Sequence, residues 1–240
     1  MTRALALLAV ALLTAGCVNT VVGMPTRAGR PAAGVAPLEQ IVPTGDEVKT
    51  AVGNDLPSHS PPVVGGIDVL PNGIRDDNDA APIECIGATE PLLRVVYEKG
   101  PVRAVADQTY WNYDFGVAVS SAHAGVIRYA SSDAAQRLFA SFTPQWQKCA
   151  GTTVTMYTHD SENTELYSKV TDVKVDGPIL SATVIGWDNH HTPPFPNEHA
   201  VGVQADVIVD VEVAIGPGGE AGTRAIDLVK VMLRKVSSTS

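Results

Sequence analysis

The sequence predicts an α+β fold, in which an antiparallel β-sheet is surrounded by packed helices and one disulfide bond joins distant parts of the chain. Strand-like runs are grouped and joined by short turns, while helical patterns occur only at intervals between them. This order is typical of antiparallel sheets and differs from the strict strand–helix alternation of parallel ones. The 240 residues, of which 45% are hydrophobic, suffice for one large domain with a sizeable core.

The first structured element is expected to be a short helix after Pro43. Thr44 and Glu47 have the spacing of a capping box, in which the threonine side chain accepts from a first-turn N–H and the glutamate reaches back. Gly53 suits the left-handed residue that ends such a helix. Residues 54–82 are rich in proline, glycine and aspartate and are expected to form loops.

Most of the chain beyond residue 85 has the composition of strands. Asp176-Gly177 marks a hairpin turn between two of them. In the last segment every second residue from Val203 to Val213 shares one apolar face, which predicts that this side is buried. Its other face is polar, includes Glu212, and is expected to meet water or a ligand. The predicted strands cover 92–97, 102–106, 115–129, 152–157, 166–175, 179–187 and 200–215.

Two longer segments have the period of amphipathic helices. In the first, apolar residues from Ala135 to Trp146 recur at helical spacing after serines suited to start the helix. Pro144 is expected to bend this helix or to end it early. The second spans about 221–236 and places basic residues near its C-terminus, where the helix dipole favours them.

The N-terminus has the pattern of a secretory signal with a lipoprotein-type cleavage site. Arg3 precedes an uncharged apolar run over residues 4–13, and three small residues lead to Cys17. The run is too short to cross a bilayer, which needs about 20 apolar residues. The segment resembles a bacterial lipobox, and this resemblance implies that Cys17 becomes the lipidated first residue of the mature protein. The alternative is an ordinary cleaved signal followed by a cysteine without that role.

These signals predict a cleaved signal peptide over residues 1–16, a lipidated cysteine with a flexible tether over 17–36, and one domain over 37–240. The mature chain would carry 16 basic and 26 acidic side chains, a formal charge of −10. Nucleic acid is not an expected partner, because such binding draws its affinity from neutralised phosphates. Anionic lipid headgroups would repel the same charge, so we expect attachment to the extracytoplasmic face of the cell membrane through Cys17.

Cys85 and Cys149 remain as an even pair once Cys17 is assigned to lipid. An exported protein meets an oxidising compartment, in which such a pair forms a disulfide. The chain-entropy model gives a bridge between them about 4 kcal/mol of stabilisation. Two separate buried thiols or a redox pair are the alternatives, but no Cys-x-x-Cys motif is present, which favours the structural bridge.

The C-terminal third of the chain contains a cluster of residue types that commonly bind metals, namely Asp188, His190, His191, Glu198 and His199. Their spacing matches no metal motif, and prolines interrupt the segment, so a solvated hairpin tip is favoured. His190, His191 and His199 stay weak candidates for metal ligands. Neither a metal nor any other cofactor is predicted.

No catalytic motif is recognised in the sequence. Ser121 and His123 share one face of a predicted strand, yet no orienting acid is evident beside them. A Gly-x-Ser-x-Gly elbow is absent. We therefore predict that the protein is not an enzyme.

Two groups of residues are candidates for ligand binding. Tyr110, Trp111 and Tyr113 form an amphipathic aromatic cluster beside a predicted loop. Such side chains supply rigid contact area for a ligand, although filling of the loop is the alternative. The second group is the polar face of the last predicted strand, with Gln204, Asp206 and Asp210.

Several segments, taken in order, resemble those of one protein family. They are Cys85-Ile86-Gly87, the segment Trp146-Gln147-Lys148-Cys149-Ala150-Gly151, the strand 203–211 and a terminal helix. Over residues 37–237 the chain thereby resembles the PknH-like extracellular sensor domain of actinobacteria, chiefly mycobacteria, found in membrane kinases and as free-standing lipoproteins. The resemblance implies an antiparallel sheet with surrounding helices and a cleft that binds an unidentified ligand.

The sequence differs from the pattern of this family in one respect. Many members carry a second disulfide, whose cysteines would fall near Asn197 and Ala214 in this chain. Neither position holds a cysteine here, so the loop expected over 186–199 should be less restrained than in those relatives.

The leading hypothesis is a lipid-anchored, sensor-like binding module without catalytic activity. Its expected partner is an unidentified small molecule, glycan, lipid or protein. One alternative is an envelope lipoprotein that assembles with a protein partner. The other is a metal-binding lipoprotein that uses the segment 188–199.

Overall fold

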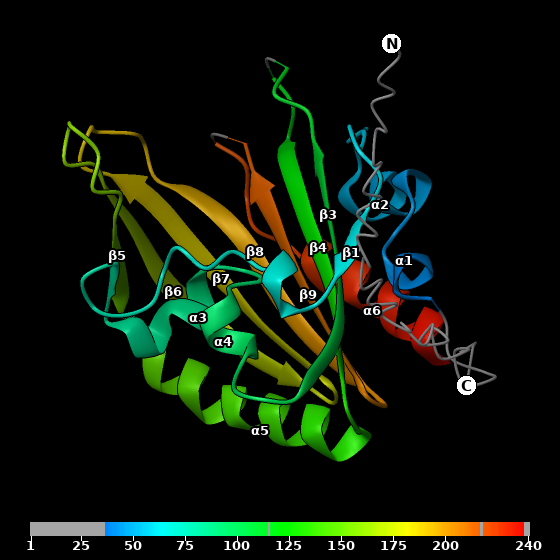
Figure 1. The fold of residues 1–240 in the computed structure, drawn as a ribbon. Coiled ribbons are helices and arrows are strands. Elements are labelled where there is room, and N and C mark those ends of the chain that lie inside the picture. Colours follow the sequence, from blue (N-terminus) through cyan, green and yellow to red (C-terminus); the bar gives the residue numbers. More distant parts are fainter. Residues whose placement is uncertain (1–36, 115, 217, 238–240) are drawn as a thin grey trace, which may run out of the picture. The chain divides into compact units, whose positions relative to one another are not determined.

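The computed structural model describes residues 37–114, 116–216 and 218–237. Within these residues, nine antiparallel strands form one sheet with helices on both faces, so the predicted α+β class is confirmed (Figure 1). The predicted signal peptide, Cys17 and the tether lie outside the described residues. In spatial order the strands are β1 (Val63–Gly65), β3 (Val102–Trp111), β4 (Val119–Tyr129), β9 (Val207–Ile215), β8 (Phe195–Gln204), β7 (Ile179–Asp188), β6 (Glu165–Asp176), β5 (Thr153–Tyr157) and β2 (Ala80–Ala81).

One face of the sheet, here called the α5 face, is crossed at one end by helix α5 (Ser132–Cys149) (Figure 1). The helix begins after Ser131, whose side chain accepts a hydrogen bond from the N–H of Ala134. Its predicted apolar stripe is buried against the strands. Shorter helices on this face precede β3, namely η1 (Ile67–Val69), η2 (Ile83–Cys85), α3 (Ile86–Thr89) and α4 (Arg94–Tyr97).

Pro144 lies inside α5, which continues to Cys149, so the prediction of an early end is wrong. A proline removes one backbone hydrogen bond and disfavours the preceding turn. Phe142 and Trp146 lie on either side of it and are both buried in the core. Burial of two large aromatic side chains stabilises the helix by several kcal/mol, about 1.5 to 3 for each, which offsets the loss.

The opposite face of the sheet carries α6 (Arg224–Ser237), α1 (Leu38–Ile41) and α2 (Gly45–Val52). Helix α2 has the predicted capping box, because Thr44 and Glu47 exchange hydrogen bonds. Gly53 ends the helix in the left-handed conformation, also as predicted.

The segment 92–97, predicted as a strand, is a turn followed by the short helix α4. Short apolar runs do not distinguish a strand from a buried helix, and here tertiary packing decides. Leu92 has a φ of 56° and its side chain packs on Gly125 of β4, where an added Cβ would come within 2.2 Å of it. The chain segment between α3 and α4 is thereby held against the α5 face.

The segment 200–215, predicted as one long strand, is the hairpin of β8 and β9. Gln204 pairs with Val207, so the turn is only Ala205-Asp206, and Ala205 has a φ of 51°. An Ala-Asp pair lacks the asparagine–glycine signature of such turns, which explains the wrong prediction. As a consequence Val203 faces the α5 core, whereas Val207 faces the opposite core.

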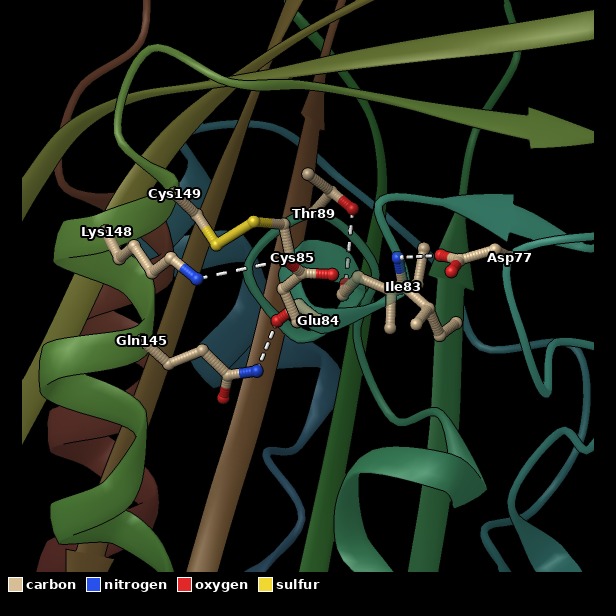
Figure 2. The surroundings of a disulfide bond; sticks show 9 residues. Asp77, Ile83, Glu84, Cys85, Thr89, Gln145, Lys148 and Cys149 are labelled. Carbon is tan, nitrogen blue, oxygen red and sulfur yellow. Dashed lines mark hydrogen bonds and ion pairs between the residues drawn. A yellow bond between two sulfur atoms is a disulfide. The ribbon is translucent and has the colours of Figure 1, made fainter.

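The predicted disulfide between Cys85 and Cys149 is confirmed, with an S–S distance of 2.01 Å (Figure 2). It joins η2 to the C-terminal end of α5. Figure 2 shows two further links between the same elements, both to Glu84. The Gln145 side-chain amide donates to the Glu84 carbonyl, and Lys148 Nζ lies 3.9 Å from the Glu84 carboxylate.

Candidate functional site

Three titratable side chains lie next to one another across the middle strands of the sheet. His123 of β4 pairs directly with Glu212 of β9, and Glu212 pairs with His199 of β8. Residues directly opposite in an antiparallel sheet point to the same face, here the α5 face. We call these three residues, with their partners Asp107, Asp210 and Glu90, the acid–histidine row. Asp210 is thus one predicted ligand residue that the structure places in the site.

His199 is held as a cation by its surroundings. Its Nε2 lies 2.8 Å from Asp210 Oδ1, and its Nδ1 lies 3.2 Å from the carbonyl oxygen of Ala88. Both partners are acceptors only, so both ring nitrogens must carry a proton. Burial by itself lowers the pKa of His199, but the charge and hydrogen bond of Asp210 outweigh it and raise the pKa above its usual value.

Asp210 is fully partnered although it is buried. Its Oδ2 accepts hydrogen bonds from the Leu92 N–H at 2.8 Å and from the Tyr97 hydroxyl at 2.6 Å. The left-handed turn at Leu92 and helix α4 therefore supply donors that balance the carboxylate. Trp146 of α5 packs on His199, with 4.8 Å between the two ring centroids.

Glu90 and Glu212, like Asp107, are partly exposed carboxylates of the row. Burial raises the pKa of Glu90 to about 8, and the repulsion from Glu212 acts in the same direction. Burial also raises the pKa of Glu212, with a contribution from Asp210, against the lowering effect of the two histidines. The Ser168 hydroxyl donates to Glu90 at 3.4 Å. The two glutamates are therefore close enough to disfavour simultaneous ionisation.

His123 has an orienting acid that sequence reasoning missed. Its Nε2 lies 2.6 Å from Asp107 Oδ1 on the neighbouring strand β3. Burial lowers the pKa of His123, but the hydrogen bond and charge of Asp107 prevail and raise it. Ser121 pairs with Trp111 and Ala214, one row further along. Among the described residues, the His123 ring is hydrogen-bonded to Asp107, and no hydrogen bond joins it to the Ser121 hydroxyl.

The predicted aromatic cluster is divided by the structure. Tyr110 is buried toward the face opposite α5, and its hydroxyl donates to the carbonyl of Pro43, which gives it a structural role. Trp111 and Tyr113 are exposed instead, at 37% and 70%. They stack with ring centroids 5.1 Å apart.

Gln204 and Asp206 lie at the β8–β9 turn, at the other end of the strand from Glu212. Asp206 accepts a hydrogen bond from the Tyr129 N–H through its carbonyl, and its carboxylate lies 3.8 Å from Arg128. These contacts join the turn to the end of β4, and the structure does not bring Gln204 or Asp206 to the row.

The three histidines named as weak metal candidates do not converge. His190 and His191 lie in the exposed turn between β7 and β8, where His190 Nε2 is 3.1 Å from the Thr164 hydroxyl. His199 belongs to strand β8, because this strand begins at Phe195 and the loop is shorter than expected. Within the described ranges no cluster of three or more metal-ligand side chains is found.

Comparisons with known proteins define the class of this chain as an extracellular domain. The chain belongs to the family of the PknH-like extracellular domain, whose model matches residues 33–235. The serine/threonine-protein kinases PknJ of Mycobacterium bovis and of Mycobacterium tuberculosis are each 25% identical to it over 201 residues. The match covers 83% of this chain and 32% of each kinase, so the chain spans about a third of the length of these curated relatives.

The crystal structure of the extracellular domain of PknH from Mycobacterium tuberculosis has the same fold. It matches with a TM-score of 0.70 and 16% sequence identity, over 86% of this chain and 100% of that one. Of the helices that the structure describes, none combines the length and apolar character needed to cross a membrane.

Proposed function

We propose that this chain is a lipid-anchored module on the extracytoplasmic face of the cell membrane that binds a ligand at the acid–histidine row without catalysing a reaction. Membership of an extracellular domain family supports the location. The apolar run before Cys17 supports the anchor. The contacts of His199 and His123 support a role without catalysis. In each, the Nε2 atom is paired with a carboxylate and not with a nucleophilic side chain.

The observation that carries the binding proposal is the pair of partly exposed glutamates, Glu90 and Glu212. Each has a raised pKa, and that of Glu90 is about 8, so the Glu90–Glu212 pair holds a proton at neutral pH that two ordinary glutamates would have lost. A ligand with a positively charged group would replace such a proton and relieve the repulsion between the two carboxylates. We therefore propose a ligand that presents a protonated amine to the row.

The anchor is tested by expression of the full chain in a mycobacterial host fed with an alkyne-labelled fatty acid. The wild-type protein is expected in the membrane fraction and labelled, whereas the Cys17→Ala variant is expected to lose the label. A Val18→Ala variant serves as the matched control and should behave as the wild type. Label retained by Cys17→Ala would contradict the anchor.

The ligand class is tested by calorimetric titration of the purified domain with spermidine and with citrate as the oppositely charged probe. Spermidine is expected to bind saturably, and a Glu90→Gln/Glu212→Gln double variant should bind it at least tenfold more weakly. Glu162 is an exposed glutamate outside the row, so Glu162→Gln is the control that should leave binding unchanged. Binding of citrate in place of spermidine, or equal binding by the double variant, would refute the proposed ligand class.

A second candidate function is assembly with a protein partner, and it is favoured by the edge strand β1. Val63 and Val64 are exposed at 56% and 50% on this strand, which forms one end of the sheet. An uncovered edge strand with apolar side chains is a template for pairing with another chain. Chemical crosslinking in cells should then capture a fixed partner, and Val63→Lys/Val64→Lys should abolish the capture.

A further inference from the structure

A stack of three exposed rings lies at the end of β3, beyond the acid–histidine row. His59 and Trp111 stack with ring centroids 3.9 Å apart, and Trp111 and Tyr113 stack at 5.1 Å. The interplanar angles are 30° and 23°, so the three rings are close to parallel. His59 Nε2 also lies 3.4 Å from the Trp111 carbonyl, which fixes the first ring on the second. At 70% exposure, Tyr113 presents most of its surface to solvent.

The stack adjoins a hollow of about 540 Å³ at this end of the sheet. Tyr113, Asp114 and Ser120 line it, together with the glycines Gly216, Gly218 and Gly219. Gly216 approaches the Val117 carbonyl so closely that an added Cβ would come within 2.5 Å of that oxygen. The wall of the hollow is therefore built by closely packed backbone. Its volume lies in the range of small-molecule sites.

The chemistry of the hollow restricts its occupant. None of the lining residues that the structure describes is a lysine, arginine or histidine, whereas Asp114 contributes a carboxylate. An anionic ligand would find no compensating charge there. The Asp114 carboxylate is an acceptor and the Ser120 hydroxyl can also accept, so these side chains favour a ligand rich in hydroxyl donors. The exposed tyrosine ring offers a flat apolar surface, which favours a ligand with an apolar ring face.

We infer that the His59–Trp111–Tyr113 stack and the adjoining hollow form a binding site for a neutral saccharide. The sugar ring stacks on Tyr113, and its hydroxyl groups donate to the acceptors of the hollow. This site goes beyond the proposed function, because it uses residues outside the acid–histidine row and a ligand class without charge.

The test is calorimetric titration of the domain with a panel of neutral trisaccharides of glucose, mannose, galactose and arabinose, with choline as a cationic probe. At least one trisaccharide is expected to bind saturably. Tyr113→Ala and Trp111→Ala should each weaken that binding at least tenfold. Tyr167→Ala is the matched control, because Tyr167 stacks on Trp187 at 5.4 Å, away from the hollow, and this variant should bind as the wild type.

Three results would overturn the inference: no binding by any trisaccharide of the panel, equal binding by Tyr113→Ala, or binding of choline alone. Because Tyr113 is largely exposed, its truncation should leave the thermal midpoint unchanged, which separates lost binding from lost folding. The sugars carry no charge, so their failure to bind would leave the proposed amine site untouched, and the reverse also holds.

Discussion

His199 and Asp210 form an ion pair on the α5 face in which both side chains are shut from solvent, at 0% and 1% exposure, with 2.8 Å between Nε2 and Oδ1. Every polar atom of the pair has a protein partner, supplied by Ala88, Leu92 and Tyr97. Such a pair is tolerated in a core only when its remaining hydrogen bonds are satisfied. The pair therefore links strands β8 and β9 to helices α3 and α4 and to the turn between them.

Removal of one partner of this pair should be strongly destabilising. Asp210→Ala leaves the cationic His199 buried without its counter-charge, and we expect a loss of about 3 to 5 kcal/mol in the free energy of unfolding. Tyr97→Phe removes only one donor to the same carboxylate and should cost less, about 1.5 to 3 kcal/mol. Urea denaturation of the two variants measures the difference. Equal losses would show that the ion pair contributes no more than an ordinary hydrogen bond.

Stability should decrease as pH rises from 5 to above 8. The folded-state pKa of Glu90 is about 8 against an ordinary 4.5, and the pKa values of Glu212 and His199 are raised as well. A group with a raised pKa binds its proton more tightly in the folded state. Its stabilising contribution is complete below the ordinary pKa and is lost as pH rises through the folded-state value. Each extra bound proton gives a slope of about 1.4 kcal/mol per pH unit.

Denaturation at pH 5, 6.5 and 8 checks this dependence. Glu90→Gln removes one of the titrating groups, so its stability should depend less steeply on pH than that of the wild type. The control Glu162→Gln should retain the wild-type slope. Stability that rises with pH over this interval would contradict the protonation states assigned to the row.

The disulfide should contribute strongly to stability. Cys85 and Cys149 are separated by 64 residues, and the chain-entropy model assigns about 4 kcal/mol to closing such a loop. We expect the Cys85→Ser/Cys149→Ser variant to lose an amount of this order in urea denaturation. A loss below about 1 kcal/mol would indicate that the contacts of Gln145 and Lys148 with Glu84 hold the same elements together without it.

An engineered second disulfide should form between positions 197 and 214, where many members of the resembled family carry one. Asn197 of β8 and Ala214 of β9 are direct partners in the sheet, and one Asn197 side-chain oxygen is buried without a hydrogen bond. Directly opposed residues lie about 4.5 to 5.5 Å apart, which suits a bridge. Asn197→Cys/Ala214→Cys should therefore oxidise spontaneously and add up to about 3 kcal/mol. Two free thiols in a labelling assay under air would contradict this register.

Much of the fold follows from local sequence patterns. The Thr44–Glu47 capping box, the Asp176-Gly177 turn and the start of α5 after Ser131 all depend on neighbouring residues, and all three are present as predicted. The error over residues 92–97 has another origin, because there a distant part of the chain decides. The chain turns at Leu92 because Gly125 leaves room for the Leu92 side chain. These two residues are far apart in sequence, so no local pattern predicts the turn.

The site was only partly predictable for the same reason. Asp210 is identifiable from the alternation of the last strand, although the hairpin at Ala205 shifts which residues share its face. Glu90, Asp107 and His123 come together through strand pairing and through the turn after α3, and no local pattern connects them. A prediction of which strands are neighbours would have been needed to place His123 beside Glu212.

Native mass spectrometry of the protein purified from its own envelope tests most directly whether the acid–histidine row holds a ligand. We expect a bound adduct carrying a protonated amine on the wild-type protein and on Glu162→Gln, and its loss from Glu90→Gln/Glu212→Gln. A wild-type protein without any adduct, or an adduct of undiminished occupancy on the double variant, would contradict it.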